Sequence, residues 1–266
     1  MSGMPPPPAA MGASININGG RAMSLSYACL QLGPEEPAEA ARERIIYAVT
    51  AEMERQGLIP CEKESAERTV VFVRRDRGTL VYDDCADRLD IVALDGLGKG
   101  LTGYLRSRGV GIMCADKGVM LRLYVDGRLR DAYISSPGGF GQRRCYWWFF
   151  CHGHALRWRE QLTPGYSVKE LADAFARGEQ GGRAVFSEMR LMLGLDEAAD
   201  FGFSSLEEVA MPGMITLYFR ASNRVRQGLA EKSARAARRA ISSIGAFLRR
   251  PQAAPKMNKM EKKGGE

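Results

Sequence analysis

Apolar and polar positions follow the pattern of short strands through the middle of the chain. The runs at 70–73 and 79–82 flank a polar, glycine-containing turn and predict a hairpin. Further runs lie at 110–115, 119–125 and 129–134, and Asp126-Gly127 between the last two is typical of a tight type I′ turn. Since strands joined by short turns pair antiparallel, these segments predict a mostly antiparallel sheet.

Helical periodicity surrounds this central stretch. Apolar residues at helical spacing predict a helix between 34 and 57, and another from about 86 to 106 that Asp83 or Asp84 would cap. Two shorter helices are expected at 167–178 and 185–194, with strands at 23–32 and 214–219. The expected fold class is α+β, a mostly antiparallel sheet covered by helices, with a helical C-terminal half.

Changes in composition divide the chain into four segments. Residues 1–22 are rich in proline and glycine and are expected to be disordered, and 23–220 form a single α+β domain with a helical subdomain at about 152–210. A basic amphipathic helix at 221–250 and a disordered basic tail at 251–266 follow. With no secretory signal and no run of eighteen apolar residues, the expected location is the cytoplasm and no transmembrane segment is expected.

The positive charge of the chain is concentrated at its C-terminal end. The 266 residues carry a net charge of +7. The segment from Arg220 to Glu266 contains thirteen lysines and arginines against three acids, a net charge of +10, so the remainder carries −3. The basic character therefore belongs to the C-terminal segment and does not predict a polyanion-binding body.

The predicted helix at 222–248 combines an apolar stripe with basic flanks. Its stripe includes Val225, Leu229, Ile241, Ile244 and Leu248, and Pro251 ends it. The basic residues around the stripe are Arg224, Lys232, Arg235, Arg238, Arg239, Arg249 and Arg250. Such a helix suits an anionic membrane surface or a protein partner. Two alternatives stay open: binding to a nucleic acid backbone, and a stripe that packs on the domain.

The segment 145–154 contains both histidines of the chain beside two of its six cysteines. Cys145, Cys151, His152 and His154 are candidate zinc ligands, although their spacing differs from the usual CxxC and HxxxH patterns. Trp147, Trp148 and Phe149 lie between the cysteines and would form a buried aromatic plug or, if exposed, a partner surface. No other cofactor is expected.

Two further patterns have a functional and a structural interpretation. Asp83, Asp84, Asp87 and Asp90 would hold a divalent cation or act as paired carboxylates, but helix capping explains them without any function and is the favoured interpretation. Gly98, Gly100 and Gly103 match GxGxxG, a dinucleotide-binding pattern. The six residues that separate Gly103 from the next strand are too few for the helix that such a site requires, so close helix packing is favoured.

The order of several of these motifs resembles a family of uncharacterised bacterial proteins. The motifs are VYDD at 81–84, a helix, CADK at 114–117, VMLRLYVDGRLRDAY at 119–133, SSPGGFG at 135–141 and SEMRLMLGL at 187–195. The resemblance covers about 23–209 and implies a shared strand, helix and hairpin fold. It implies no activity and no site residues. The glycine-rich helix, the YWWFF segment and the basic C-terminal segment depart from the family pattern.

These observations favour a non-enzymatic binding or scaffold module whose basic C-terminal helix docks on an anionic membrane or protein surface. The alternative is an enzyme or zinc-binding protein that uses the Cys145–His154 loop or the aspartates at 83–90. Nucleic-acid binding through the basic tail is a further alternative. The absence of a GxSxG elbow and of a Walker A loop excludes only two common enzyme classes.

Overall fold

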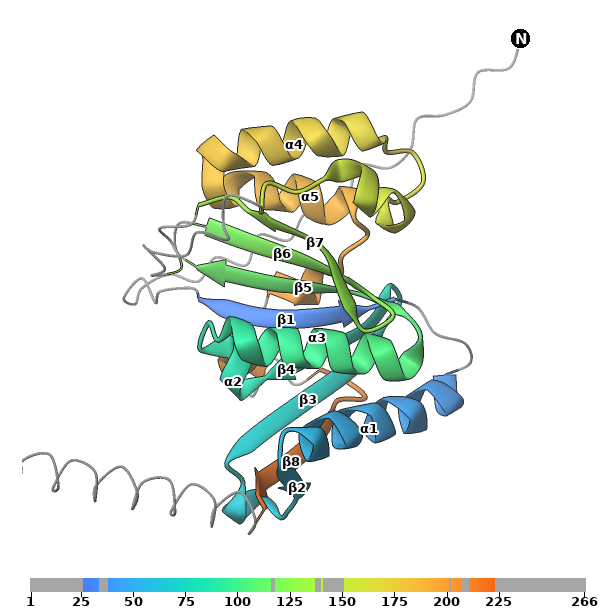
Figure 1. Ribbon diagram of the computed structural model, residues 1–266, viewed down its shortest axis with the longest axis vertical. Helices are drawn as coiled ribbons and strands as arrows, with labels where there is room; N and C mark the ends of the chain where they lie inside the picture. The colour runs from blue at the N-terminus through green and yellow to red at the C-terminus, as the bar shows by residue number, and fades with distance from the viewer. Residues whose placement is uncertain are drawn as a thin grey trace, which may run out of the picture.

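The computed structural model describes residues 26–33, 38–115, 118–136, 140, 151–200, 202–206 and 211–222. These residues form one eight-stranded antiparallel sheet with the strand order β2-β8-β3-β4-β1-β5-β6-β7 (Figure 1). The strands are β1 (Tyr27–Leu32), β2 (Leu58–Pro60), β3 (Arg68–Arg75), β4 (Gly78–Asp83), β5 (Arg108–Ala115), β6 (Gly118–Val125), β7 (Arg128–Ile134) and β8 (Ile215–Ala221). The predicted α+β class with a mostly antiparallel sheet is confirmed.

Local turn chemistry sets the register of the sheet. Asp126 and Gly127 have φ angles of 48° and 78°, the left-handed conformation that a type I′ turn requires, and they connect β6 to β7 as predicted. The β3–β4 hairpin pairs Arg75 with Gly78. The order of the strands also depends on pairing between segments that are distant in sequence. Strand β1 lies between β4 and β5, and β8 lies between β2 and β3.

One face of the sheet is covered by the helices α1 (Ala38–Arg55), α2 (Asp84–Asp87) and α3 (Ile91–Leu105) (Figure 1). The predicted apolar stripe of α1 is buried at Ile45, Val49 and Met53. It packs with Leu94, Leu97 and other residues of α3 in the apolar core on this face. The short 3-10 helix η1 (Lys63–Ser65) lies between β2 and β3.

The helix predicted at 86–106 is divided into α2 and α3, which corrects that prediction. Leu89 has a φ of 60°, a left-handed conformation that a leucine in a helix does not adopt. Asp90 then begins α3, because its carboxylate accepts hydrogen bonds from the amides of Val92 and Ala93. Ala93 is buried, whereas Val92 is 80% exposed. The buried stripe of α3 therefore includes Ala93 and excludes Val92.

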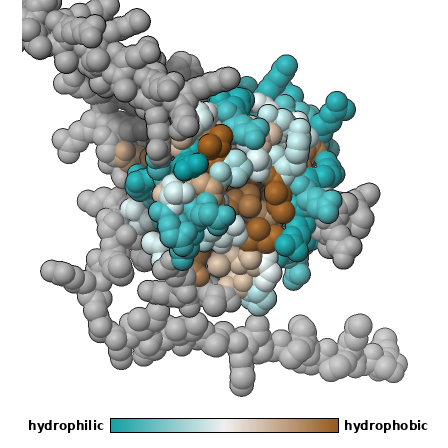
Figure 2. Space-filling view, turned by 90° about the horizontal axis from the view of Figure 1, so that it is seen from below, coloured by the Kyte–Doolittle hydropathy of each residue, from teal (hydrophilic) through white to brown (hydrophobic). Residues whose placement is uncertain are grey.

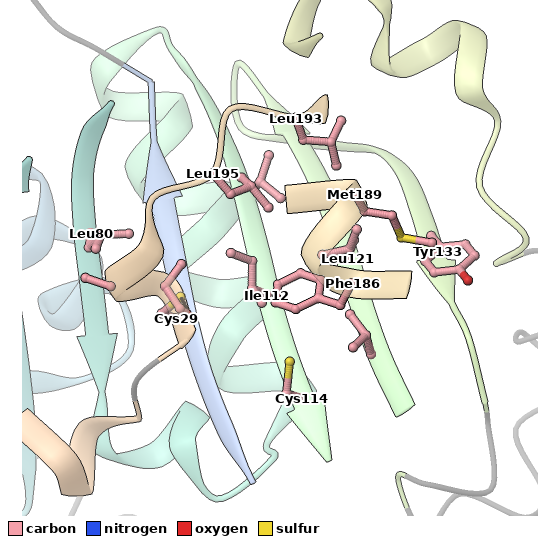
Figure 3. Packing of buried hydrophobic residues seen from close by; sticks show 14 of the residues in the cluster. Cys29, Leu80, Ile112, Cys114, Leu121, Tyr133, Phe186, Met189, Leu193 and Leu195 are labelled. Atoms are coloured by element: carbon pink, nitrogen blue, oxygen red, sulfur yellow. Dashed lines mark hydrogen bonds between the residues drawn. The ribbon is translucent and has the colours of Figure 1, made fainter. Parts of the chain in front are cut away.

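The opposite face is covered by α4 (Val168–Gly181), α5 (Phe186–Met192) and four 3-10 helices. These are η4 (Ala155–Gln161), η5 (Gly182–Val185), η6 (Glu197–Asp200) and η7 (Phe203–Ser205). Figure 3 shows Phe186 and Met189 of α5 beside Ile112, Leu121 and Tyr133 of the sheet. The described residues thus form three layers, with the sheet between two sets of helices (Figure 1).

The predicted helical C-terminal half is not supported. Between 151 and 222 the described chain contains two α-helices, several 3-10 turns and β8, which occupies the position of the strand predicted at 214–219. The expected N-terminal segment 1–22 and all but the first two residues of the expected helix 221–250 lie outside the described residues. Among the helices that the structure describes, none has the length and apolar character needed to cross a membrane.

Candidate functional site

The carboxylates of the 83–90 cluster bind neighbouring backbone and arginine groups. Asp83 caps α2 through the amide of Cys85, and both of its oxygens accept hydrogen bonds from Arg68, at 2.9 and 2.6 Å. Asp84 accepts from the amide of Thr69 at 3.2 Å. With Asp90 at the start of α3, the capping interpretation is confirmed for Asp83 and Asp90.

Asp87 connects two segments that are distant in sequence. One carboxylate oxygen accepts a hydrogen bond from the amide of Ala28 in β1 at 3.1 Å, and the other from the amide of Ser204 in η7 at 3.4 Å. Gly202 lies against this carboxylate, where a Cβ would come within 2.8 Å of an Asp87 oxygen. Asp87 therefore satisfies one backbone donor of β1, at a residue that β4 does not pair, and one backbone donor of η7.

The closest group of metal-ligand atoms within the described residues is Asp83, Asp84 and Cys85, whose ligand atoms lie within 4.8 Å of one another. Arg68 already places a guanidinium on both oxygens of Asp83. Burial raises the pKa of Cys85 and of Asp84, which favours their protonated forms. A cation here would have to displace Arg68 and deprotonate a thiol, so this geometry favours a structural role.

Three of the four candidate zinc ligands, Cys151, His152 and His154, lie within the described residues, and their side chains do not all point to the same side of the chain. The chain pairs with β7 through a bridge between His152 and Tyr133, with the amide of Ile134 donating to the carbonyl of Cys151. Neighbouring side chains of an extended segment point to opposite sides. Cys151 is buried in the core beneath α1 and α3, whereas His152 and His154 are exposed. Burial raises the pKa of Cys151 to about 11.

The other residues of the predicted sites lie outside the described residues. They comprise Cys145 of the zinc set, the aromatic residues Trp147, Trp148 and Phe149, and the basic residues Arg224, Lys232, Arg235, Arg238, Arg239, Arg249 and Arg250. The zinc set, the aromatic surface and the basic helix therefore stay predictions.

The GxGxxG glycines lie within α3, and two of them face the β6–β7 hairpin. A Cβ at Gly98 would overlap the ring of Tyr124, and one at Gly103 would lie 3.2 Å from the Cα of Gly127. Thr102 donates to the carbonyl of Gly98 at 2.6 Å and accepts from the amide of Gly127 at 3.1 Å. The motif thus brings a helix close to a turn, as the packing interpretation expects.

A hollow of about 500 Å³ lies where the end of α1 meets α3 and β3, and Arg55, Gln56 and Arg68 are among the residues that line it. These three residues belong to a polar network around Glu52, which is fully buried. Glu52 accepts hydrogen bonds from Arg55 and from Gln56, and the Gln56 amide oxygen accepts one from Arg68 at 2.5 Å. Because Arg68 also binds Asp83, a continuous chain of charged and amide groups connects α1 to β3 and β4. Each of these groups is satisfied by its neighbour, so the network holds elements together.

A second polar network lies under α3. Asp95 accepts two hydrogen bonds from Arg122, at 2.6 and 3.0 Å, and one from the hydroxyl of Tyr124 at 2.7 Å. Lys99 lies 3.2 Å from the same carboxylate. Burial raises the pKa of Tyr124, so its hydroxyl stays protonated and donates to Asp95. The carboxylate attaches α3 to the middle of β6.

A further hollow lies at the β7 edge of the sheet. We call it the arginine hollow; its volume is about 800 Å³ and it is lined by Arg108, Val125, Leu129, Arg130, Leu156, Arg157, Arg159 and Glu160. The sequence pattern alone does not predict this hollow. The RLR triplet at 128–130 and the RWR triplet at 157–159 were the available signal, but nothing in the sequence indicates that they meet.

Comparison of the chain with protein-family models, with curated proteins and with solved structures finds no match.

Proposed function

We propose that this protein is an α+β binding module that docks on an anionic membrane surface through its basic C-terminal segment, 221–250. The observation that carries the proposal is the separation of charge along the chain. The segment from 220 to 266 has a net charge of +10, whereas the rest of the chain carries −3. An anionic surface would attract the segment and weakly repel the body, which would orient the docked protein.

The position of β8 supports an outward path for this segment. The amide of Ser222, directly after β8, donates to the carbonyl of Gly57 at 2.9 Å, so the described chain ends beside β2. Because β2 is the edge strand and covers only the last three residues of β8, this is one border of the sheet. A segment that continues from this border can contact an external surface while the sheet stays intact.

The apolar stripe favours a membrane over a nucleic acid. Val225, Leu229, Ile241, Ile244 and Leu248 recur at helical spacing among the basic residues. Phosphate contacts need only the basic residues, whereas a bilayer interface takes up apolar side chains as well. The alternative is that the stripe packs on the body or on a protein partner. Figure 2 shows apolar residues exposed at the β2–β8 end of the molecule, where Ile59 is 36% exposed.

The state of the cysteines fits a cytoplasmic location, which is part of the proposal. Cys29, Cys61, Cys85, Cys114 and Cys151 are all free thiols. Free thiols are typical of proteins in reducing compartments.

The proposal is tested by co-sedimentation of the full-length chain with vesicles that contain phosphatidylserine, and with vesicles of phosphatidylcholine alone. A variant with Arg235, Arg238 and Arg239 changed to glutamine should lose about 3 kcal/mol of binding free energy, since each basic residue near such a surface contributes about 1 kcal/mol. The matched control changes Lys256, Lys259 and Lys262 to glutamine. It removes the same charge from outside the apolar stripe and should lose less.

Two further measurements separate the alternatives. The double change Ile241→Asn and Ile244→Asn should weaken sedimentation with unchanged charge if the stripe enters the interface. Equal weakening by the arginine and lysine variants, with no effect of the isoleucine changes, would indicate a purely electrostatic polyanion contact such as a nucleic acid backbone. Failure of the unmodified chain to sediment with anionic vesicles at low salt would overturn the proposal.

A further inference from the structure

Strand β7 contains a β-bulge at the border of the arginine hollow. In the pairing of β6 with β7, Leu123 lies opposite Asp131 and Tyr124 lies opposite Leu129, which leaves Arg130 as the extra residue. A bulge interrupts the alternation of side chains and redirects the extra one. Arg130 consequently lines both the arginine hollow and the neighbouring hollow of about 430 Å³ that Cys151 and Arg122 also line. Bulges of this kind are over-represented next to functional sites.

The guanidinium groups around this hollow fall into two classes. Arg108 is paired with Glu160, and Arg157 donates to the carbonyl of Arg130 at 3.1 Å and lies 3.4 Å from Asp131. Arg130 and Arg159 have no acidic partner within the described parts of the chain, and both are exposed. The four arginines around the hollow therefore have only two carboxylate partners among the described residues, those of Glu160 and Asp131.

The wall that presents Arg157 and Arg159 is fixed to the sheet. The buried carboxylate of Asp131 accepts hydrogen bonds from the indole of Trp158 at 2.6 Å and from the amide of His154 at 2.5 Å. Trp158 lies between the two arginines in sequence and is itself fully buried. Because η4 is anchored at this tryptophan, Arg157 and Arg159 are held at the rim on a rigid support. Such pre-organisation reduces the entropic cost of binding.

The hollow also has an apolar part. Leu129 and Val125 are half-buried along its lining, and Leu156 is 65% exposed. Its volume of about 800 Å³ lies within the usual range for small-molecule sites, roughly 300–1,000 Å³. A ligand that fits would be a small molecule with a doubly charged anionic group and an apolar portion.

We propose that the arginine hollow binds a small phosphate monoester, with the phosphate held by Arg130 and Arg159 and the organic portion against Leu129 and Leu156. The planar guanidinium group forms two parallel hydrogen bonds with phosphate oxygens, and two guanidinium groups without an acidic partner among the described residues match the two charges of a monoester. This site lies at the opposite edge of the sheet from β2 and is independent of the proposed membrane contact.

The test is calorimetric titration of the full-length chain with phenyl phosphate, inorganic phosphate and phenol. Phenyl phosphate is expected to bind most tightly, because it alone has both the charge and the apolar ring. The double variant Arg130→Gln, Arg159→Gln should weaken phenyl phosphate binding by about tenfold or more, since charge-assisted hydrogen bonds are lost. The variant Leu156→Ser should reduce the preference for phenyl phosphate over inorganic phosphate.

The matched control removes two exposed cations elsewhere, through Arg42→Gln and Lys169→Gln, and should bind phenyl phosphate as the unmodified chain does. Far-ultraviolet circular dichroism confirms that each variant is folded. Equal losses in the two double variants would show a nonspecific charge effect and overturn the site. So would a chain that binds a single-stranded oligonucleotide but no phenyl phosphate, which would indicate an extended polyanion.

Discussion

Arg68 and Asp83 form a buried two-point ion pair, with Nε and Nη2 of the guanidinium 2.9 and 2.6 Å from the two carboxylate oxygens. Both residues are more than nine-tenths buried. Arg68 begins β3 and Asp83 ends β4, so the pair closes the open end of the first hairpin. It also orients the carboxylate that caps α2. One interaction therefore connects two strands and a helix.

Changing Asp83 to asparagine should lower the free energy of unfolding by about 3–5 kcal/mol, because the buried Arg68 loses its counter-charge. The measurement is urea denaturation followed by circular dichroism. The double change Arg68→Met, Asp83→Leu should be less destabilising than Asp83→Asn alone. The exposed pair of Arg177 and Glu188 is the control, and Arg177→Gln should cost far less than Asp83→Asn, because solvent screens an exposed ion pair. A small effect of Asp83→Asn would contradict the buried-charge argument.

Changing Gly98 to alanine should destabilise the protein although alanine favours helices by about 1 kcal/mol over glycine. The new methyl group would overlap the Tyr124 ring, which is buried and hydrogen-bonded to Asp95. Gly96→Ala is the matched control on the same helix. Its Cβ would lie 2.9 Å from Nε2 at the far end of the flexible Gln56 side chain, which can shift at a lower cost than the buried Tyr124 ring. In thermal unfolding, the midpoint temperature of the Gly98→Ala variant should be lower than that of the Gly96→Ala variant.

Changing Asp131 to asparagine should loosen η4, because the indole of Trp158 and the amide of His154 both donate to this carboxylate. The expected loss is about 1.5–3 kcal/mol, the range for hydrogen bonds to a charged group. Asp126→Asn is the control, since Asp126 has a φ of 48° and asparagine tolerates that conformation. Urea denaturation compares the two. Equal stability of the two variants would contradict the anchoring role.

Stability should fall above pH 9 because of Cys151. Burial raises its pKa from 9.0 to about 11, so the folded state holds the thiol proton more tightly than the unfolded state does. This contribution is fully present below about pH 9 and is lost as the pH rises to about 11. Between those limits the difference in unfolding free energy between the unmodified chain and Cys151→Ala should shrink by roughly 2–3 kcal/mol. If the unfolding free energies of the two proteins changed with pH in the same way, the predicted role of Cys151 would be contradicted.

Local sequence signals predicted the features that depend on neighbouring residues. Asp126-Gly127 predicted the turn between β6 and β7, and the aspartates Asp83 and Asp90 predicted helix caps. The break at Leu89 was missed, because its left-handed conformation follows from how α2 and α3 both reach the sheet. Arg130 was missed for a related reason. A bulge is a property of the pairing between two strands, and the sequence of β7 alone does not contain the register of β6.

The insertion of β8 between β2 and β3 has a consequence for how the protein is made. β3 and β4 can pair as soon as residue 83 has been synthesised, but the other edge of β3 gains its partner only when residues 215–221 exist. During that interval a β-branched edge, TVVFV, is open to pairing with other chains. Arginines at both ends of β3 place positive charge beside this edge. They would discourage the nascent chain from aggregating until its own last strand arrives.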